Sequence, residues 1–408
     1  MRGCHHPPPA MHTIPLSSIR RARPAGSLQL TALPPLALYI HFPWCVKKCP
    51  YCDFNSHAQK DGLPEQQYIA ALLTDLESCL PLIWGRPVVS IFMGGGTPSL
   101  FSAAAINTLL EGIRARVKLL PDAEITLEAN PGTFEAEKFA GYRDAGVNRL
   151  SIGIQSFDDA KLKALGRIHG RDEALAAIGI ARQHFDNFNL DIMYALPEQT
   201  LDEALADIDT ALACGPTHLS AYHLTLEPNT LFHRYPPALP DDDLAADMQD
   251  AIEARLAAAG FEHYETSAFA RPGRRAFHNL NYWTFGDYLG LGAGAHAKIS
   301  FPDRIVRQLR YKQPGEYLAQ SQAGSTLQSE EVVGIEQLPF EFMLNALRLT
   351  GGFDLAIFEE RTGQPLASVL PEIERGIRDG LLERNGNWLA PSATGRRFLN
   401  TLLERFLK

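Results

Sequence analysis

The chain has 408 residues, of which 45% are hydrophobic and 21% are charged, and this composition is typical of a globular protein. Its formal net charge of −9 argues against a broad basic surface for nucleic acid, and no apolar run reaches the roughly 18 to 20 residues that a membrane-spanning helix needs. The six cysteines, three clustered and three scattered, do not form a secreted disulfide pattern, and they favour a metal or redox cluster in a reducing, cytoplasmic compartment.

The first 35 residues differ from the rest, because they contain Pro, Arg and Ser but no acidic residue. We expect residues 1–35 to form a disordered N-terminal extension. A targeting peptide has a similar composition, but the proline run and Pro24 would interrupt the amphipathic helix that such a peptide forms.

From Leu36 onward, short β-rich apolar stretches alternate with helical patterns. The predicted strands are 36–42, 88–95, 124–130, 149–155, 187–194 and 218–224, and the predicted helices are 65–80, 102–117, 133–146, 171–185 and 201–215. Repeated strand–helix units indicate parallel pairing with helical crossovers. The pattern therefore predicts an α/β fold, and by itself it allows an open doubly wound sheet or a barrel.

Each predicted strand ends on a polar residue or on glycine. These ends are His41, 94–97 (GGGT), Glu128 with Asn130, Gln155, Asp191 and His223. In α/β folds the carboxyl ends of the parallel strands lie at one edge of the sheet, and the active or binding site is located there. Six such ends in succession indicate a functional site rather than a solvated edge.

Cys45, Cys49 and Cys52 lie in the loop after the first predicted strand, within the stretch WCVKKCPYCDFNSH. Thiolates suit iron–sulfur clusters, zinc or copper(I). Three cysteines leave one iron of a four-iron cluster without a protein ligand, and an open position of this kind is typical of a working metal. Zinc is the alternative, with His41 or His57 completing a site of three cysteines and one histidine.

The spacing Cys-x3-Cys-x2-Cys, with Tyr51 before the third cysteine, resembles the signature of the radical S-adenosylmethionine (SAM) superfamily. The resemblance implies a partial (β/α)6 TIM-like barrel and a [4Fe–4S] cluster whose open iron is chelated by S-adenosylmethionine. GGGTP at 94–98 resembles the superfamily motif that meets the methionine end of that cofactor. Glycines suit this role because they let the backbone approach a ligand closely.

A longer series of motifs, over about residues 36–300, resembles the oxygen-independent coproporphyrinogen III oxidase family. These motifs are YIHFPWC, GGGTPS, EITLEANP, RLSIGIQSF, LGRIH and LDIMYALPEQT. The cofactor contacts that this resemblance implies are Tyr39, Tyr51, Gly95, Gly96, Thr97, Glu128, Gln155, Arg167 and Asp191. The last three match positions that bind a second S-adenosylmethionine in the oxidase.

One position departs from the oxidase pattern, which has a further cysteine two residues after the third. Phe54 stands there, as in the haem chaperone branch of the family, and HNLNYW at 278–283 matches the HNxxYW pattern of that branch. The resemblance implies a protein that binds haem and delivers it to an acceptor protein of respiratory type. The haem-binding residues that it implies are His278, Tyr282, Trp283 and His296.

Two alternatives stay open at this point. The HNxxYW run can be a packed loop whose polar groups are satisfied internally. The protein can also be a coproporphyrinogen III dehydrogenase of porphyrin biosynthesis, which would act by radical oxidative decarboxylation.

The chain divides into an extension (1–35), a radical SAM core (36–240), a core-completing segment with HNxxYW (241–306) and a C-terminal part (307–408). Within the last part we expect a linker over 307–324, followed by amphipathic helices and an Asn-Gly hairpin that resemble a winged-helix module. Residues 330–408 hold 9 Lys and Arg against 12 Asp and Glu, which argues for a packing or docking surface rather than DNA binding. We therefore expect no nucleic acid partner and at most peripheral contact with a membrane.

Overall fold

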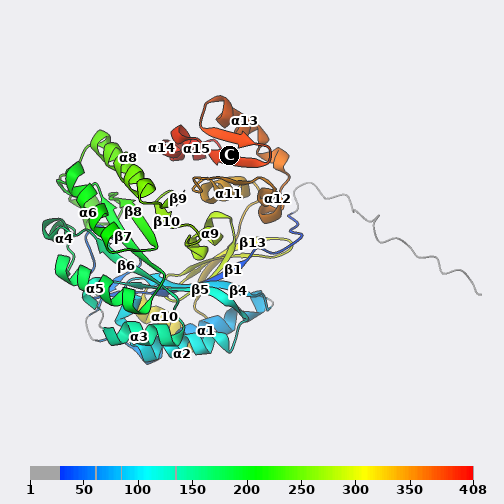
Figure 1. The fold of residues 1–408 in the computed structure, drawn as a ribbon. Coiled ribbons are helices and arrows are strands. Elements are labelled where there is room, and N and C mark those ends of the chain that lie inside the picture. The colour runs from blue at the N-terminus through cyan, green and yellow to red at the C-terminus, as the bar shows by residue number, and fades with distance from the viewer. Residues whose placement is uncertain (1–27, 60–61, 84, 134–135, 408) are drawn as a thin grey trace, which may run out of the picture.

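The computed structural model describes residues 28–407 apart from 60–61, 84 and 134–135. The disorder expected for residues 1–27 lies outside this range. A curved sheet of 12 strands runs through the molecule in the order β14-β13-β12-β11-β1-β4-β5-β6-β7-β8-β10-β9 (Figure 1). The two outermost strands do not pair with each other, so the sheet forms an open, partial barrel as predicted.

Six strands in the middle of the sheet run parallel, and helices connect them. The strands are β1 (Leu36–Phe42), β4 (Val88–Gly95), β5 (Leu119–Ala129), β6 (Arg149–Gln155), β7 (Phe188–Tyr194) and β8 (His218–His223). The helices are α1 (Glu65–Ile83), α2 (Ala103–Arg114), α3 (Ala136–Ala145), α4 (Asp159–Ala164), α5 (Arg171–His184) and α6 (Leu201–Ala213). This arrangement confirms the predicted α/β class, and the helices cover the outer face of the curved sheet (Figure 1).

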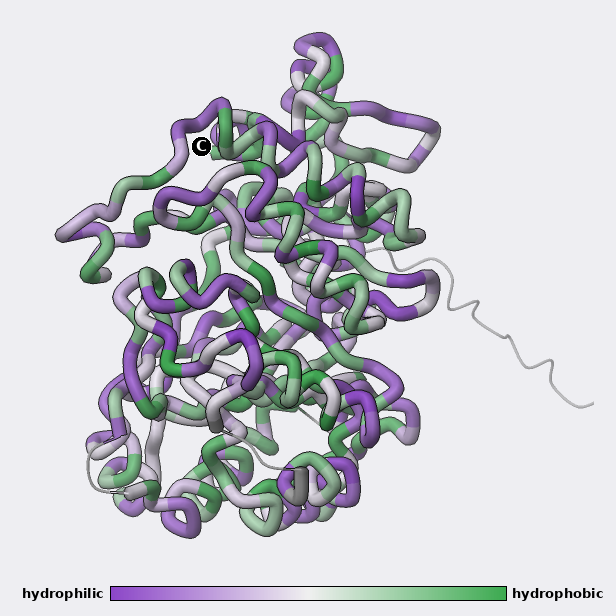
Figure 2. Tube along the Cα trace, turned by 60° about the vertical axis from the view of Figure 1, so that its left-hand side comes forward, coloured by the Kyte–Doolittle hydropathy of each residue, from purple (hydrophilic) through white to green (hydrophobic). Residues whose placement is uncertain are grey.

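Period-two alternation sorts the residues of these strands between the two faces of the sheet. On β1, Leu38 and Ile40 belong to the main hydrophobic core, together with Leu72 and Leu76 of α1. The residues that alternate with them, Tyr39 and His41, belong to the opposite, concave face. Along the outer helices, hydrophobic and hydrophilic residues alternate with the helical turns (Figure 2). The apolar faces of the helices pack against the outer face of the sheet, and the polar residues of the strands lie on its inner, concave face.

Further strands extend both edges of the parallel region. β11 (Asp287–Leu291) pairs in parallel with β1, whereas β12 (His296–Ser300), β13 (Ile305–Arg310) and β14 (Leu327–Val332) follow in antiparallel order. β10 (Ala268–Ala270) and β9 (Glu262–Glu265) close the other end, and α8 (Asp242–Ala258) packs against α6. α9 (Phe277–Trp283) contacts β1, β4 and β11 from within the curve of the sheet (Figure 1).

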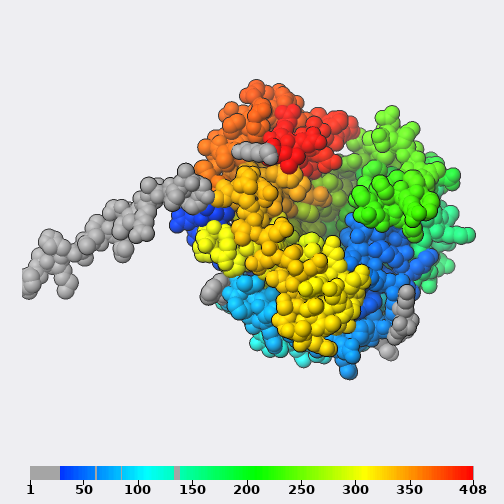
Figure 3. All heavy atoms as spheres, turned by 180° about the vertical axis from the view of Figure 1, so that it is seen from behind, coloured from blue at the N-terminus to red at the C-terminus, as the bar shows by residue number. Residues whose placement is uncertain are grey.

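The segment 307–324 is not the linker that its sequence predicted. It contains part of β13 and all of α10 (Pro314–Ala323), which packs against α1. Arg310 Nε lies 2.9 Å from the carboxylate of Asp75, which is fully buried on α1 and also accepts a hydrogen bond of 2.9 Å from the Tyr317 hydroxyl. The polar composition was misleading because these polar groups are buried against one another rather than solvated. From behind, this segment (yellow) fills the surface between the N-terminal part (blue) and the C-terminal domain (orange and red) (Figure 3).

Residues 28–35 also differ from the expected disordered extension. Leu28 and Leu30 are buried in the hydrophobic cluster of the C-terminal domain. The backbone N–H of Leu30 donates to the carbonyl of Pro302 at 2.8 Å. Residues 28–35 therefore connect the core to the C-terminal domain.

The C-terminal domain contains the helices and the hairpin that were predicted, and a further short strand extends the hairpin to a three-stranded sheet. Its elements are α11 (Leu338–Ala346), β15 (Phe353–Asp354), α12 (Ala356–Thr362), α13 (Leu370–Arg378), β16 (Leu382–Asn385), β17 (Trp388–Pro391), α14 (Ala393–Arg397) and α15 (Leu399–Glu404). The predicted hairpin is formed by β16 and β17, and Gly386 adopts a positive φ of 60° in its turn. Short 3₁₀ helices occur at Pro98–Leu100, Pro131–Thr133 and Leu366–Ser368. Among the described helices, none has both the length and the apolar character that crossing a membrane requires.

Candidate functional site

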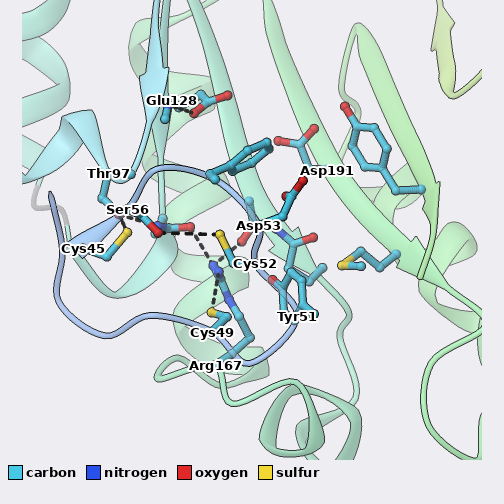
Figure 4. Close-up of a pocket in the computed structure, with 18 of the residues that line it drawn as sticks. Cys45, Cys49, Tyr51, Cys52, Asp53, Ser56, Thr97, Glu128, Arg167 and Asp191 are labelled. Atoms are coloured by element: carbon cyan, nitrogen blue, oxygen red, sulfur yellow. Dashed lines mark hydrogen bonds between the residues drawn. The ribbon is translucent and has the colours of Figure 1, made fainter. Parts of the chain in front are cut away.

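A cavity of about 350 Å³ lies at the carboxyl ends of the parallel strands, and all three clustered cysteines line it (Figure 4). The predicted cofactor-binding residues that also line it are Tyr51, Gly95, Gly96, Thr97, Glu128, Gln155, Arg167 and Asp191. These residues come from the cysteine loop and from the ends of β4, β5, β6 and β7, with Arg167 in the loop after α4. The strand ends thus converge on one site, as the sequence predicted.

Tyr39 is the one predicted cofactor contact that does not line this cavity. Its hydroxyl donates to His41 Nδ1 at 2.9 Å, and its ring stacks on Phe92 with 6.3 Å between the centroids. It lies on the concave face of β1 before the strand end, and its hydroxyl contacts His41, whose ring packs against Gly95.

The loop that carries the cysteines is fixed at both ends. It begins in β2 (Trp44–Cys45), which pairs in parallel with β3 (His57–Ala58). The side-chain amide of Asn55 donates to the carbonyls of Ala293 at 2.9 Å and Lys312 at 2.8 Å, and these two residues lie beside the antiparallel strands β12 and β13. Asn55 was not among the residues predicted from the sequence, because both of its partners lie more than two hundred positions away along the chain.

The cysteines do not form a site for a single ion. In the part of the chain that the structure describes, no group of three or more His, Cys, Asp or Glu side chains is placed to hold one metal ion. His41, one candidate fourth ligand for zinc, uses both ring nitrogens, with Tyr39 on one side and the carbonyl of Asn55 at 2.9 Å on the other. In a four-iron cluster each cysteine binds a different iron, so the three sulfurs need not meet at one point as they must around a single zinc ion. Three sulfurs that line one cavity without meeting at one point therefore fit a cluster better than zinc.

Glycines at the end of β4 allow the cavity to form. Gly95 has a φ of +108°, and a Cβ atom there would lie 2.3 Å from the His41 ring. A Cβ atom on Gly96 would lie 2.5 Å from the carbonyl oxygen of Trp44. No other residue type fits at these two positions, so the GGGT stretch brings the β4 backbone directly against the start of the cysteine loop.

Two partly buried carboxyl groups face the cavity from β5 and β7, with β6 between these strands. Glu128 accepts a hydrogen bond of 3.1 Å from the backbone N–H of Gly95. Burial, together with the negative charge of Asp191, raises the pKa of Glu128 to about 8. Burial also raises the pKa of Asp191, although this carboxylate accepts hydrogen bonds from Asn189 and Ser151. Such a pair is suited to a cationic ligand, because a positive charge would compensate the buried negative charge.

The same cavity has an apolar wall that the sequence analysis did not identify. Tyr222 on β8 and Met193 on β7 line it, and so does Phe54, whose side chain is 60% exposed. At the end of β8 the residue predicted from the sequence was His223, which also lines the cavity. Tyr222, two residues after Ser220, belongs to the concave face of that strand, and strict period-two alternation would have identified it.

The HNxxYW residues lie apart from this cavity, on α9. The helix begins where the carboxylate of Glu124 accepts the backbone N–H groups of Phe277 and His278, both at 3.1 Å. The His278 side chain is buried, with Nδ1 3.0 Å from the Ser90 hydroxyl and the ring stacked on Phe92 at 5.0 Å. Burial lowers the pKa of His278 to about 3, so the imidazole is neutral. The motif is therefore a helix in the interior rather than a packed loop.

Tyr282 and Trp283 continue the packing of this helix. The Tyr282 ring contacts His278 and Tyr288 edge to face, at 4.9 Å and 4.5 Å between centroids, and the Arg348 guanidinium lies 4.4 Å from the Trp283 ring centroid. Within the described residues, neither His278 Nε2 nor Trp283 Nε1 has a hydrogen-bond partner, although both atoms are buried. His296, the fourth predicted haem contact, is an exposed residue at the start of β12.

Comparisons with known proteins agree with this geometry. Residues 39–211 match the Radical SAM superfamily, and residues 336–398 match the HemN C-terminal domain. The chain is 50% identical over 380 residues to the heme chaperone HemW of Escherichia coli (strain K12), covering 93% of this chain and 100% of that protein. It is 49% identical to the heme chaperone HemW of Haemophilus influenzae, covering 92% and 98% of the two chains.

A solved structure shows the same fold. The coproporphyrinogen III oxidase HemN of Escherichia coli, described as a radical SAM enzyme, matches with a TM-score of 0.78 over 92% of this chain and 90% of that chain, at 24% identity. The chain therefore belongs to the heme chaperone HemW family, and its residues 39–211 form a domain of the Radical SAM superfamily.

Proposed function

We propose that the protein is a cytoplasmic haem chaperone that carries a [4Fe–4S] cluster with exchangeable S-adenosylmethionine and delivers haem to an acceptor protein of respiratory type. The observation that carries this proposal is the 50% identity to the heme chaperone HemW over the whole length of that relative. Phe54 supports it, since a phenylalanine cannot supply the sulfur that the oxidase pattern has at this position.

The cluster would be held by Cys45, Cys49 and Cys52, which line one cavity, and no fourth cysteine of the described residues lines it. When bound, such a cluster supplies an electron and an open iron that S-adenosylmethionine can chelate. The chain's own part is to hold and orient this cofactor. Gly95 and Gly96 leave room for its methionine end, and Glu128 offers a carboxylate to this positively charged sulfonium cofactor.

Further contacts in the same cavity would complete the cofactor site. Tyr51, Thr97, Gln155 and Asp191 line it together with the cysteines. Tyr39 would act indirectly, because its hydroxyl orients His41, whose ring packs against Gly95. We do not assign a second S-adenosylmethionine, since Arg167 already donates to Asn130 and to the Gly153 carbonyl.

Haem cannot reach His278 in the arrangement described, because this side chain is 2% exposed and packs between Ser90 and Phe92. Ligation of haem by His278, with Tyr282 and Trp283 beside the macrocycle, therefore requires α9 to leave the interior of the sheet. The unpaired ring nitrogens of His278 and Trp283 favour such a movement, since a buried donor or acceptor without a partner costs about 1–3 kcal/mol. His296 needs no such movement, and it is the alternative ligand.

The proposal is tested with anaerobically reconstituted protein. We expect saturable haem binding and transfer of the bound haem to the apo form of a respiratory haem protein. We also expect no protoporphyrinogen when coproporphyrinogen III, S-adenosylmethionine and a reductant are supplied. Protoporphyrinogen formation without haem transfer would contradict the proposal and identify the protein as a dehydrogenase.

A pair of cysteine variants tests the cluster assignment separately. Cys52→Ala should abolish iron binding, because it removes one of three ligands. Cys214→Ala is the matched control, since this cysteine lies at the end of α6 and does not line the cavity. Equal iron content in the two variants, measured by metal analysis, would refute the assignment.

A further inference from the structure

Each of the three cysteine sulfurs has a polar partner, and the three partners come from different segments of the chain (Figure 4). The Thr97 hydroxyl, at the end of β4, donates to Cys45 Sγ at 3.5 Å. The Ser56 hydroxyl, within the cysteine loop, lies 3.7 Å from Cys52 Sγ. The third partner is charged, because Arg167 Nη1 donates to Cys49 Sγ at 3.8 Å.

Arg167 is held firmly in this position. Its Nη2 donates to the Asn130 side chain at 2.6 Å and to the carbonyl of Gly153 at 2.8 Å. The guanidinium is thus fixed from β5 and β6 while its other nitrogen faces the sulfur. A side chain fixed in this way is placed to act on Cys49, rather than to swing out toward a second ligand.

We propose that Arg167 sets the reduction potential of the cluster through Cys49. This inference rests on the proposed binding of a cluster by the three cysteines. The reduced cluster carries one more electron than the oxidised cluster, so a fixed positive charge beside a ligand sulfur stabilises the reduced form and raises the potential. The contacts of Thr97 and Ser56 with the other two sulfurs are neutral, and a neutral hydrogen bond is roughly half as strong as a charged one. Arg167 is therefore a positioning residue with a larger effect than either hydroxyl.

The test is an EPR-monitored redox titration of the full chain, reconstituted anaerobically, with iron content measured in parallel. In Arg167→Gln, at the wild-type midpoint, we expect the ratio of reduced to oxidised cluster to fall at least tenfold, which is 59 mV for a one-electron couple. Arg167→Lys keeps the charge and should recover at least half of this shift. Lys48→Gln removes the same charge from an exposed position on the cysteine loop and should shift the potential by less than a third as much.

The inference is overturned if Arg167→Gln retains iron and shifts the potential no more than Lys48→Gln does. If Arg167→Gln does not retain iron, the inference is tested with Asn130→Asp and Asn130→Ser instead. Both variants remove the amide that contacts Arg167, but only the aspartate places a negative charge beside the guanidinium. The aspartate variant must then have the lower potential, and equal potentials would refute the inference. If the wild-type chain binds no iron, the proposed cluster itself is refuted. If the chain binds iron but the potential of Arg167→Gln is not shifted, only the role of Arg167 is refuted.

Discussion

Glu128 is the side chain whose protonation state matters most for a cationic ligand. It is partly buried at the end of β5, and burial raises its pKa to about 8, so that it is mostly neutral at pH 7. The backbone N–H of Gly95 donates to it, which fixes the carboxyl group at the glycine-rich end of β4. Ionisation of Glu128 and binding of the positively charged sulfonium cofactor should therefore favour each other.

We predict that S-adenosylmethionine binds the cluster-loaded protein more tightly as the pH rises through about 8. Glu128 is uncharged below this pH and carries a negative charge above it, so the affinity should increase about tenfold between pH 7 and pH 8.5. Calorimetric titration at several pH values measures this dependence. Glu128→Gln should bind weakly with little change over the same range, and an equal pH dependence in this variant would contradict the role of Glu128.

At the scale of single residues, some of the contacts in the site could be predicted from the sequence and others could not. The spacing of Cys45, Cys49 and Cys52 predicted that they act together, and the structure places all three around one cavity. The hydrogen bond from Tyr39 to His41 and the anchoring of Asn55 to Ala293 and Lys312 were not predictable. The latter contact joins residues more than two hundred positions apart, and no local pattern encodes such a distance.

At the scale of single elements, α9 is the most unusual part of the structure. It is a helix of seven residues inside a curved sheet, between the core strands and the C-terminal domain. Leu280 and Trp283 pack against the hydrophobic cluster of the C-terminal domain, whereas His278 points to Ser90 on β4. The helix therefore connects the two parts of the molecule and buries the HNxxYW side chains in doing so.

We predict that haem binding increases amide hydrogen exchange over residues 277–283. The helix must leave the sheet for His278 to reach iron, and its protected N–H groups would then be exposed to solvent. Exchange in α2, on the outer face of the sheet, should stay unchanged as the internal control. Bound haem with unchanged protection of α9 would contradict the movement and would place the haem ligand elsewhere, as at the exposed His296.

Secondary structure was predictable where strands and helices alternate, because each strand has an apolar face that the helices cover. β1, β4 and β6 have the bounds that were predicted from their apolar runs. The segment 307–324 was not predictable in the same way. Its buried residues include Arg310 and Tyr317, and only their convergence on Asp75 of α1 makes them part of the core.

At the scale of the whole molecule, the core and the C-terminal domain share one hydrophobic cluster. Leu28 and Leu30 before β1, and Phe285 and Ile305 from the extended sheet, belong to the same cluster as α11 to α15. The two parts should therefore unfold together, since neither can lose this cluster alone.

We predict that Leu30→Ala lowers the free energy of unfolding of the whole chain by about 2–4 kcal/mol, because it leaves a cavity in this shared cluster. Leu344→Ala is the matched control, since this leucine is 43% exposed on α11, and its effect should stay below about 0.5 kcal/mol. Denaturant titration with fluorescence detection measures both. Equal stability of the two variants would show that residues 28–35 do not connect the two parts.

The central claim is that three cysteines hold an iron–sulfur cluster with one iron open to S-adenosylmethionine. EPR spectroscopy of the anaerobically reconstituted and reduced chain, before and after addition of S-adenosylmethionine, tests it most directly. We expect the signal of a reduced [4Fe–4S] cluster, with a clear change in its shape when the cofactor is added. A chain that retains no iron, or a cluster signal that the cofactor leaves unchanged, would contradict the claim.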